Sequence, residues 1–266
     1  MMNAWSMTRF ATTIAALMDA EAPTQADAPL ELPLEYARKR LAGPVQRMLI
    51  YNPDCLGHWF WQKYTNLLSP VQADAPLAIP LSTMMPAVTP VCFGTMYTGA
   101  MPAVHGIRAY EKPIIRIDSL FDSLPRSKKR VALVAVEGSS MAKIFAGRPI
   151  DYHILPDDDA VVERTLELIS ENRHDLVVAY NQAYDDMIHE TTPESPGAMA
   201  AARAHVDAFA HLAAQARESW RGLDSMLFWA PDHGNHVDWD GHGNHGEYRE
   251  EDINVVHLCG ALPSGR

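Results

Sequence analysis

From residue 46 onward, short apolar runs alternate with segments of helical pattern, and this alternation constrains the fold more than any other feature of the sequence. The apolar runs are short and rich in Val, Leu and Ile, which is typical of buried strands. They are RMLIY (47–51), VALVAV (131–136), DLVVAY (175–180) and SMLFWA (225–230), and the helical segments include residues 158–172 and 197–220. Strands that alternate with helices indicate an α/β layered fold with a mostly parallel sheet.

The first 45 residues differ from the rest, because they show helical patterns around a loop rich in Pro, Ala and Asp. We therefore predict an N-terminal helical extension over residues 1–45 and a single α/β domain over residues 46–266. The chain has 266 residues, of which 47% are hydrophobic. That content is ample for one large core.

Charge and cysteine content restrict the partners and the compartment. The net charge is 22 − 33 = −11, which argues against binding to a nucleic-acid polymer. The three cysteines, an odd number without pairing motifs, favour a reducing compartment. No apolar run approaches the roughly 18 residues of a membrane span. Residues 10–18 have a faint signal-peptide outline, but their apolar residues recur at helical spacing. We expect a cytoplasmic location, with export as the alternative.

Acidic and histidine side chains follow three of the predicted strands, where an α/β fold binds its ligands. They are Asp54 after the first strand, Asp185, Asp186 and His189 after the third, and Asp232, His233, His236, His242 and His245 after the fourth. Each group alone has an ordinary explanation, such as a helix cap, a turn or a solvated loop. Their joint placement favours a metal site, since Asp and His ligate Zn²⁺ or Mn²⁺. Asp185 and His189 are four residues apart, so one helical turn directs both to one ion.

The segment TPVCFGTMYTG (89–99) predicts a short helix over residues 90–98. Pro90 suits its first position, Thr89 is a favoured N-cap and Gly99 is a favoured stop. A helix N-terminus attracts anions, so the Thr89 hydroxyl is placed for attack on phosphorus. Cys92 lies three residues further on, and it either lines the site or is an ordinary small buried residue.

These motifs together resemble the alkaline phosphatase superfamily, and most of all its nucleotide pyrophosphatase/phosphodiesterase branch. The likeness rests on TPVCFGTMYTGAMPAVHGI (89–107), on the spacing of Asp185 and His189, on DHG (232–234) and on HG (245–246). The form DHGN is also similar to that of the superfamily's phosphomutases. The resemblance covers about residues 47–258. It implies a three-layer sandwich with a mostly parallel central sheet and helices on both faces.

The resemblance also implies two divalent metal ions, Zn²⁺ or alternatively Mn²⁺, and a phospho-threonine intermediate on Thr89. The implied ligands of one ion are Asp54, Thr89, Asp232 and His233, and those of the other are Asp185, His189 and His245. Three of these positions have rivals: Asn52 for Asp54, Asp186 for Asp185 and His242 for His245. The following sequence EYREEDINV favours His245. Cys92 stands where an asparagine often holds a phosphate oxygen, and its thiol is only a weak donor.

The function implied is a two-metal hydrolase of phosphate esters, with diesters or nucleotides favoured over simple monoesters. Monoester dianions usually need a further cation, which Lys143 in GSSMAKIF is placed to supply, although a solvated helix lysine is the ordinary interpretation. The alternative is a phosphomutase-like transferase or a degenerate metal- and phosphate-binding protein. The expected partner is a small phosphorylated molecule, and the sequence leaves the oligomeric state open.

Overall fold

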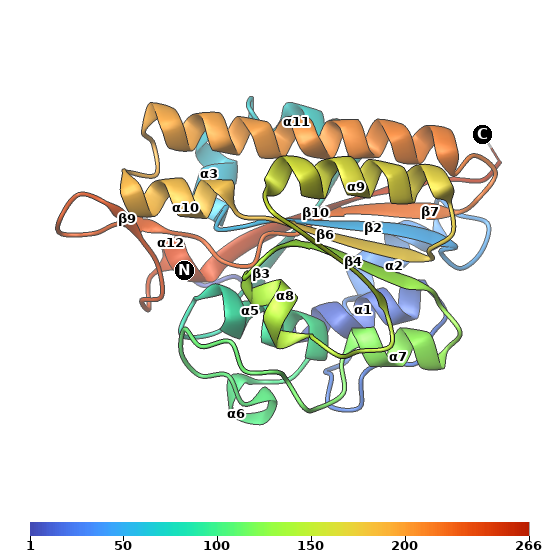
Figure 1. Ribbon diagram of the computed structural model, residues 1–266. Coiled ribbons are helices and arrows are strands. Elements are labelled where there is room, and N and C mark those ends of the chain that lie inside the picture. The colour runs from blue at the N-terminus through green and yellow to red at the C-terminus, as the bar shows by residue number, and fades with distance from the viewer. Residues whose placement is uncertain (266) are drawn as a thin grey trace.

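The computed structural model describes residues 1–265, and its centre is an eight-stranded sheet (Figure 1). The strands lie in the order β1 (Trp5–Ser6), β3 (Leu77–Ser82), β10 (Asn254–Leu262), β7 (Ser225–Trp229), β2 (Arg47–Pro53), β6 (Leu176–Asn181), β4 (Val131–Val136) and β5 (Asp151–Leu155). Strand β10 is antiparallel to its neighbours β3 and β7, and all other neighbouring pairs are parallel. The mostly parallel sheet predicted from the sequence is therefore confirmed.

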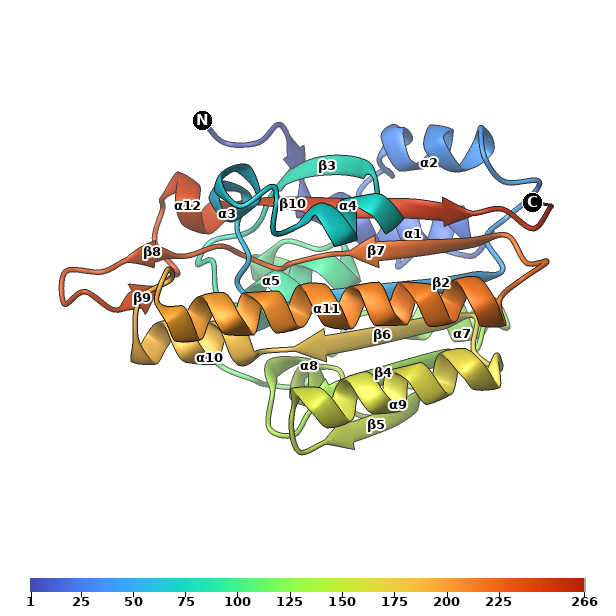
Figure 2. The same cartoon turned by 90° about the horizontal axis from the view of Figure 1, so that it is seen from above.

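Helices cover both faces of this sheet, as the apolar character of its central strands requires. One face carries α3 (His58–Lys63), α4 (Ser69–Asp74), α9 (Asp158–Glu171), α10 (Ala183–Glu190) and α11 (Pro196–Ser219). The other carries α1 (Phe10–Leu17), α2 (Glu31–Arg38), α5 (Thr89–Thr98), α7 (Leu120–Arg126) and α8 (Ser140–Ile144). Figure 2 shows α9 and α11 running along the sheet. The three-layer arrangement is thus the one predicted.

Strand β2 shows how the sequence builds two cores. Met48 and Ile50 belong to one buried cluster, whereas Leu49 and Tyr51 belong to the other. Successive side chains of a strand point to opposite faces, so a run of consecutive apolar residues supplies both layers at once. The register places Tyr51 beside Trp229 of β7 and Pro53 beside Asn181 of β6. The carboxyl ends of β2, β6 and β7 consequently meet at one edge of the sheet.

The N-terminal segment contains the predicted helices and also joins the sheet. Trp5 of β1 pairs in parallel with Leu81 of β3. The 3₁₀ helix η1 (Met7–Arg9) and α1 follow, and Phe10 packs edge-on against Tyr97 and Phe228 at ring distances of 6.1 and 5.9 Å. Residues 1–45 therefore contribute to the same buried core as the strands that follow.

Small elements complete the edge at which the strands β2, β6 and β7 end. They are the hairpin of β8 (His236–Val237) and β9 (Gly243–Asn244) and α12 (Glu250–Ile253), while the short helix α6 (Pro102–His105) packs on α5. Helix α5 ends at Gly99, whose φ of +71° is left-handed, as predicted for a glycine stop. None of the helices in residues 1–265 combines the length and the apolarity needed to cross a membrane.

Candidate metal centre

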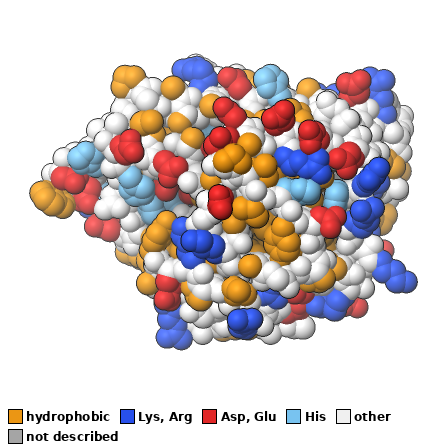
Figure 3. All heavy atoms as spheres, viewed as in Figure 1, with side chains coloured by type: hydrophobic (Ala, Val, Ile, Leu, Met, Phe, Trp, Pro, Cys, Tyr) orange, Lys and Arg blue, Asp and Glu red, His pale blue; other side chains and the backbone are white. Residues whose placement is uncertain are grey.

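Three strand ends bring the predicted acidic and histidine side chains to one place. Asp54 follows β2, Asp185 lies in the first turn of α10 after β6, and Asp232 and His233 follow β7. Asp54, Asp232 and His233 are buried. Figure 3 shows acidic and histidine side chains gathered at the end of the molecule where α10 and the β8–β9 hairpin lie.

The first group of donor atoms surrounds Nε2 of His233. It lies 3.4 Å from Oδ1 of Asp54, 3.4 Å from Oδ2 of Asp232 and 3.2 Å from Oγ1 of Thr89. Both of these carboxylate oxygens are buried and lack a hydrogen-bond donor. The other oxygen of Asp54 accepts a hydrogen bond from the Tyr180 hydroxyl, and Nδ1 of His233 lies 3.1 Å from the Gly234 carbonyl oxygen. A donating Nδ1 leaves the lone pair of Nε2 directed at the carboxylates.

The second group joins α10 to the segment after β9. Nε2 of His189 and Nε2 of His245 are 3.1 Å apart, and they lie 3.5 and 3.3 Å from Oδ1 of Asp185. This oxygen too is buried without a hydrogen-bond donor. His245 Nδ1 lies 2.9 Å from the Ala87 carbonyl oxygen, just before α5. The segment that leads directly into Thr89 thus orients a histidine of the second group.

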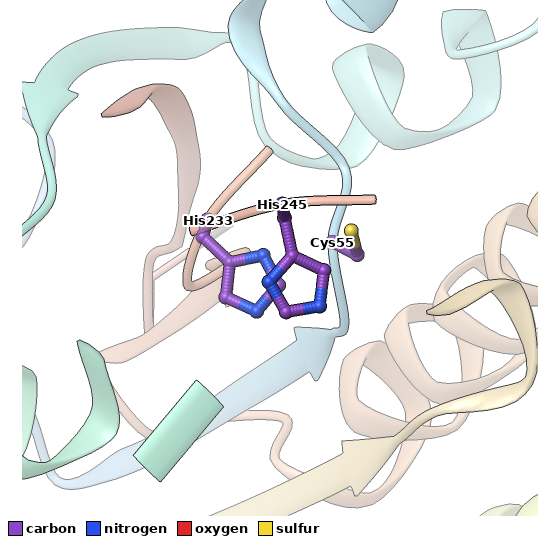
Figure 4. A group of neighbouring side chains, drawn as sticks. All are labelled: Cys55, His233 and His245. Carbon is purple, nitrogen blue, oxygen red and sulfur yellow. The ribbon is translucent and has the colours of Figure 1, made fainter. Parts of the chain in front are cut away.

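These spacings fit a metal ion in each group. Ligand atoms about 2.0–2.1 Å from a tetrahedral Zn²⁺ stand about 3.3 Å from one another. The six distances run from 3.1 to 3.5 Å, and the Asp and His ligand atoms of each group all lie within 4.8 Å of one another, so each group is compatible with one ion. The two groups adjoin, since the His233 and His245 rings stack with centroids 4.2 Å apart (Figure 4).

The pKa shifts of the acidic and histidine side chains are also compatible with a bound cation. Burial and the nearby Asp232 carboxyl raise the pKa of Asp54 well above its usual value, and burial raises the pKa of Asp232 to about 7. Burial lowers the pKa of His233 to about 3, so that its ring is neutral at pH 7, as a metal ligand must be. Burial opposes ionisation of Asp185, but the neighbouring rings of His189 and His245 outweigh it and hold the pKa of Asp185 well below its usual value. Carboxyl groups crowded and buried in this way favour a cation among them.

Thr89 differs from the prediction in one respect. Helix α5 begins at Thr89 itself, the N-cap is Val88, and no side chain caps the helix. The predicted capping role of Thr89 is therefore wrong, because its hydroxyl is directed to His233 rather than to the backbone of its own first turn.

The three alternative ligands considered from the sequence, Asn52, Asp186 and His242, contact residues outside the two donor groups. Asn52 donates a hydrogen bond to the Ala230 carbonyl oxygen and accepts one from the Tyr97 hydroxyl, both at 2.6 Å. Asp186 accepts a hydrogen bond from Gln182. His242 is exposed on the β8–β9 hairpin and lies 3.3 Å from Asp240. The structure thus groups Asp54, Asp185 and His245 with the other donors, and not their rivals.

A cavity of about 160 Å³ opens beside the donor groups. Its lining residues are Asp54, Thr89, Tyr110, Lys112, Glu137, Gly138, Ser139, Ser140, Tyr180, Gln182, Asp185 and Asp186. Cys92 and Lys143, the two predicted substrate-binding residues, are not among them. The Cys92 side chain is fully buried in the core below the sheet, with Sγ 3.9 Å from the Met84 carbonyl oxygen, and Lys143 is exposed on α8.

Sequence reasoning missed two residues at the centre. Lys112 lines the cavity, but it lies in the irregular segment between α6 and α7, where no periodicity marks it. The Cys55 thiol lies within 4.8 Å of ring nitrogens of His233 and His245 (Figure 4). The feature of the sequence that could have identified Cys55 is its position directly after Asp54, a predicted ligand. Cys55 has a left-handed φ of +68°, a conformation that favours glycine.

No protein-family model matches the chain, and no curated protein matches its sequence. Solved structures do match. A phosphonoacetate hydrolase from Sinorhizobium meliloti 1021, in complex with phosphonoformate, is 16% identical with a TM-score of 0.53, and the match covers 75% of this chain and 59% of that one. The chain therefore spans less than two thirds of that hydrolase.

Murine ectonucleotide pyrophosphatase/phosphodiesterase 5 matches over more of its length. The structure is that of an inactive threonine-to-alanine variant in complex with AMP, 12% identical with a TM-score of 0.60, and the match covers 82% of this chain and 88% of that one. The human counterpart is 15% identical with a TM-score of 0.54, and it covers 72% and 58%. At the level of the fold, the chain has the alkaline-phosphatase-like architecture that its motifs predict.

Proposed function

We propose that this protein is a two-metal-dependent hydrolase of phosphate esters that uses Thr89 as its nucleophile. One observation carries the proposal: two adjoining sets of Asp and His donor atoms, each spaced as around one ion, lie beside a buried threonine hydroxyl. The ligands proposed for one ion are Asp54, Thr89, Asp232 and His233, and those for the other are Asp185, His189 and His245. Zn²⁺ suits these donors, with Mn²⁺ as the alternative.

Bound ions supply two things here: they lower the pKa of the threonine hydroxyl and neutralise charge on phosphoryl oxygens. Oγ1 of Thr89 forms a bond to phosphorus while the bond from phosphorus to the leaving oxygen breaks, which yields a phospho-threonine and the free alcohol. Water then hydrolyses the phospho-threonine and restores the hydroxyl. The contact of His233 Nδ1 with the Gly234 carbonyl oxygen and the hydrogen bond from the Tyr180 hydroxyl to Asp54 keep these two side chains in place during both steps.

The finer assignments rest on the resemblance and stay predictions. These are the preference for diesters or nucleotides and the identity of the metal; the cytoplasmic location, which rests on the cysteine content and the N-terminal segment, also stays a prediction. A degenerate binding protein is less well supported than a hydrolase, because the residue that suggested it, Cys92, lies in the core rather than in the cavity.

The direct test is turnover of p-nitrophenyl phosphate and of bis(p-nitrophenyl) phosphate by purified protein before and after treatment with EDTA. We expect turnover of at least one ester, its loss on chelation, and its recovery on addition of Zn²⁺ or Mn²⁺. Full activity of protein shown by elemental analysis to be metal-free would contradict the proposal.

A further inference from the structure

Among residues 1–265, Lys112 is the one positively charged side chain that lines the cavity. It lies in the segment that joins α6 to α7, and its Nζ donates a hydrogen bond to the carbonyl oxygen of Gly138, in the turn after β4, at 3.1 Å. The Tyr110 ring flanks it, with the centroid 5.2 Å from Nζ. These two contacts hold the ammonium group at the cavity wall.

This ammonium group has no carboxylate partner within 4.0 Å among residues 1–265, although most charged side chains that leave water are paired. An ammonium has three donors, and the bond to Gly138 uses one of them. Burial, together with the charge of Lys143 nearby, lowers the pKa of Lys112. The half-buried cation is thus partly desolvated and still has donors to offer.

The cavity limits what an occupant can be. A volume of about 160 Å³ is well below the roughly 300–1,000 Å³ of pockets that enclose drug-sized ligands. It admits a phosphoryl group, while a nucleoside or other large substituent has to remain outside. Thr89 and Asp54 line the same cavity as Lys112, so a phosphoryl group placed for attack by Thr89 lies in a space that Lys112 also borders.

We propose that Lys112 binds a phosphoryl oxygen that carries the second negative charge of a dianionic phosphate monoester, and that it thereby makes small monoesters the preferred substrates. The inference rests on the proposed hydrolase function and deepens it. It competes with the preference for diesters that the resemblance implies. In a diester that oxygen is alkylated and uncharged, so the same lysine gains no ion pair and meets additional bulk.

The test uses two substrates that differ by one charge, p-nitrophenyl phosphate and methyl p-nitrophenyl phosphate, at pH 8 with metal-loaded protein. In Lys112→Met we expect kcat/KM for the monoester to fall roughly ten- to a hundredfold, the range for a lost charged hydrogen bond. For the methyl diester we expect less than about a threefold change under the same principle. Lys112→Arg should restore most of the monoester activity.

Two further variants give the controls. Arg108→Met removes a positive charge from the same segment but not from the cavity wall, and it should leave both rates unchanged. If Lys143→Met rather than Lys112→Met lowers the monoester rate selectively, or if Lys112→Met lowers both rates equally, the inference is overturned. A purely structural role for Lys112 predicts that equal loss, together with a lower melting temperature that arginine does not restore.

Failure of the proposed function has a different outcome. If wild-type protein with bound metal hydrolyses neither ester, the hydrolase proposal fails, and the binding site is still tested by calorimetry with inorganic phosphate and dimethyl phosphate. Tighter binding of inorganic phosphate that Lys112→Met weakens roughly tenfold or more supports the subsite. Equal binding of both anions by wild type and variant refutes it.

Discussion

Helix α5 forms two threonine–histidine pairs that look alike and differ in what surrounds them. Thr89 Oγ1 lies 3.2 Å from Nε2 of His233, and Thr95 Oγ1 lies 3.1 Å from Nε2 of His105. The second nitrogen of His105 accepts a hydrogen bond from the Ile107 N–H, so the Thr95–His105 pair is complete within the protein. The first pair faces two buried carboxylate oxygens that lack donors.

This difference separates a structural histidine from a candidate ligand. His105 fastens α6 and the following turn to α5, and burial lowers its pKa to about 4 without any carboxylate near its ring nitrogens. His205 belongs to the same structural kind, since its nitrogens lie 3.0 Å from the Tyr51 hydroxyl and 3.3 Å from the Tyr184 backbone nitrogen. Buried polar groups are normally satisfied in this way. Unsatisfied oxygens around His233 therefore distinguish the Thr89–His233 pair as the candidate metal-binding one.

The largest effect is expected at the two threonines. Thr89→Ala should lower turnover at least about a thousandfold because the covalent route disappears. Thr89→Ser should keep part of the activity, since it preserves the hydroxyl. Thr95→Ala is the matched control: it breaks the other threonine–histidine pair and should cost about 1 kcal/mol of stability while turnover stays within a fewfold of wild type. A Thr89→Ala protein with wild-type turnover would refute the nucleophile assignment.

The next effect concerns metal content. Asp232→Asn keeps the shape of a fully buried side chain but removes the charge of a proposed ligand, so the protein should lose at least one of two bound ions. The control is His205→Gln, which alters a buried histidine with a structural role, and this variant should retain both metal ions. Elemental analysis of freshly purified proteins measures this directly, and equal metal content in Asp232→Asn and wild type would contradict the ligand set.

A smaller effect is expected where α5 meets His105. A Cβ added at Gly94 would lie 2.7 Å from Cε1 and 2.9 Å from Nδ1 of the His105 ring. The ring is held through both nitrogens and has little room to move, so Gly94→Ala should destabilise the protein by about 1–3 kcal/mol. That corresponds to a fall in Tm of roughly 2–12 °C for a chain of this size.

Gly43→Ala gives the control for this substitution, because a Cβ there meets nothing within 4 Å. An unchanged Tm in Gly94→Ala would show that the His105 ring is not fixed as described. Turnover per folded molecule should be close to normal in both variants, since neither touches the donor groups.

The sequence predicts the fold well where burial dictates composition. Residues 131–136 coincide with β4 because a central parallel strand must be apolar on both faces. Strand β3 was not predicted, since Pro80 interrupts it, and β5 at the sheet edge is largely exposed and lacks a continuous apolar run.

The residues of the candidate site also differ in whether the sequence predicts their position. The Asp and His donors follow strands, so the rule for strand ends predicts from the sequence alone that they lie together. Lys112 reaches the cavity from an irregular segment whose path depends on tertiary contacts, and no local pattern encodes that path. Cys92 illustrates the converse: three residues after Thr89 on a fully buried helix, it packs into the core rather than facing the cavity.

A pH dependence of stability, similar in size to the effect at Gly94, arises from the structural histidine His205. Burial lowers the pKa of His205 to about 3, against about 6.5 when the chain is unfolded. Its contribution is therefore fully present above pH 6.5 and is lost as the pH falls from 6.5 towards 3, because the unfolded chain then takes up a proton that the folded protein refuses. Between pH 7.5 and pH 5 this histidine alone should lower the free energy of unfolding by about 2 kcal/mol.

Urea unfolding of EDTA-treated protein at the two pH values measures the loss without interference from metal binding. His205→Gln does not titrate in this range, so its loss should be smaller than that of wild type by about the same 2 kcal/mol. Equal losses in wild type and variant would mean that His205 is protonated in the folded protein, and the contrast between structural histidines and candidate ligands would then have to be drawn on other grounds.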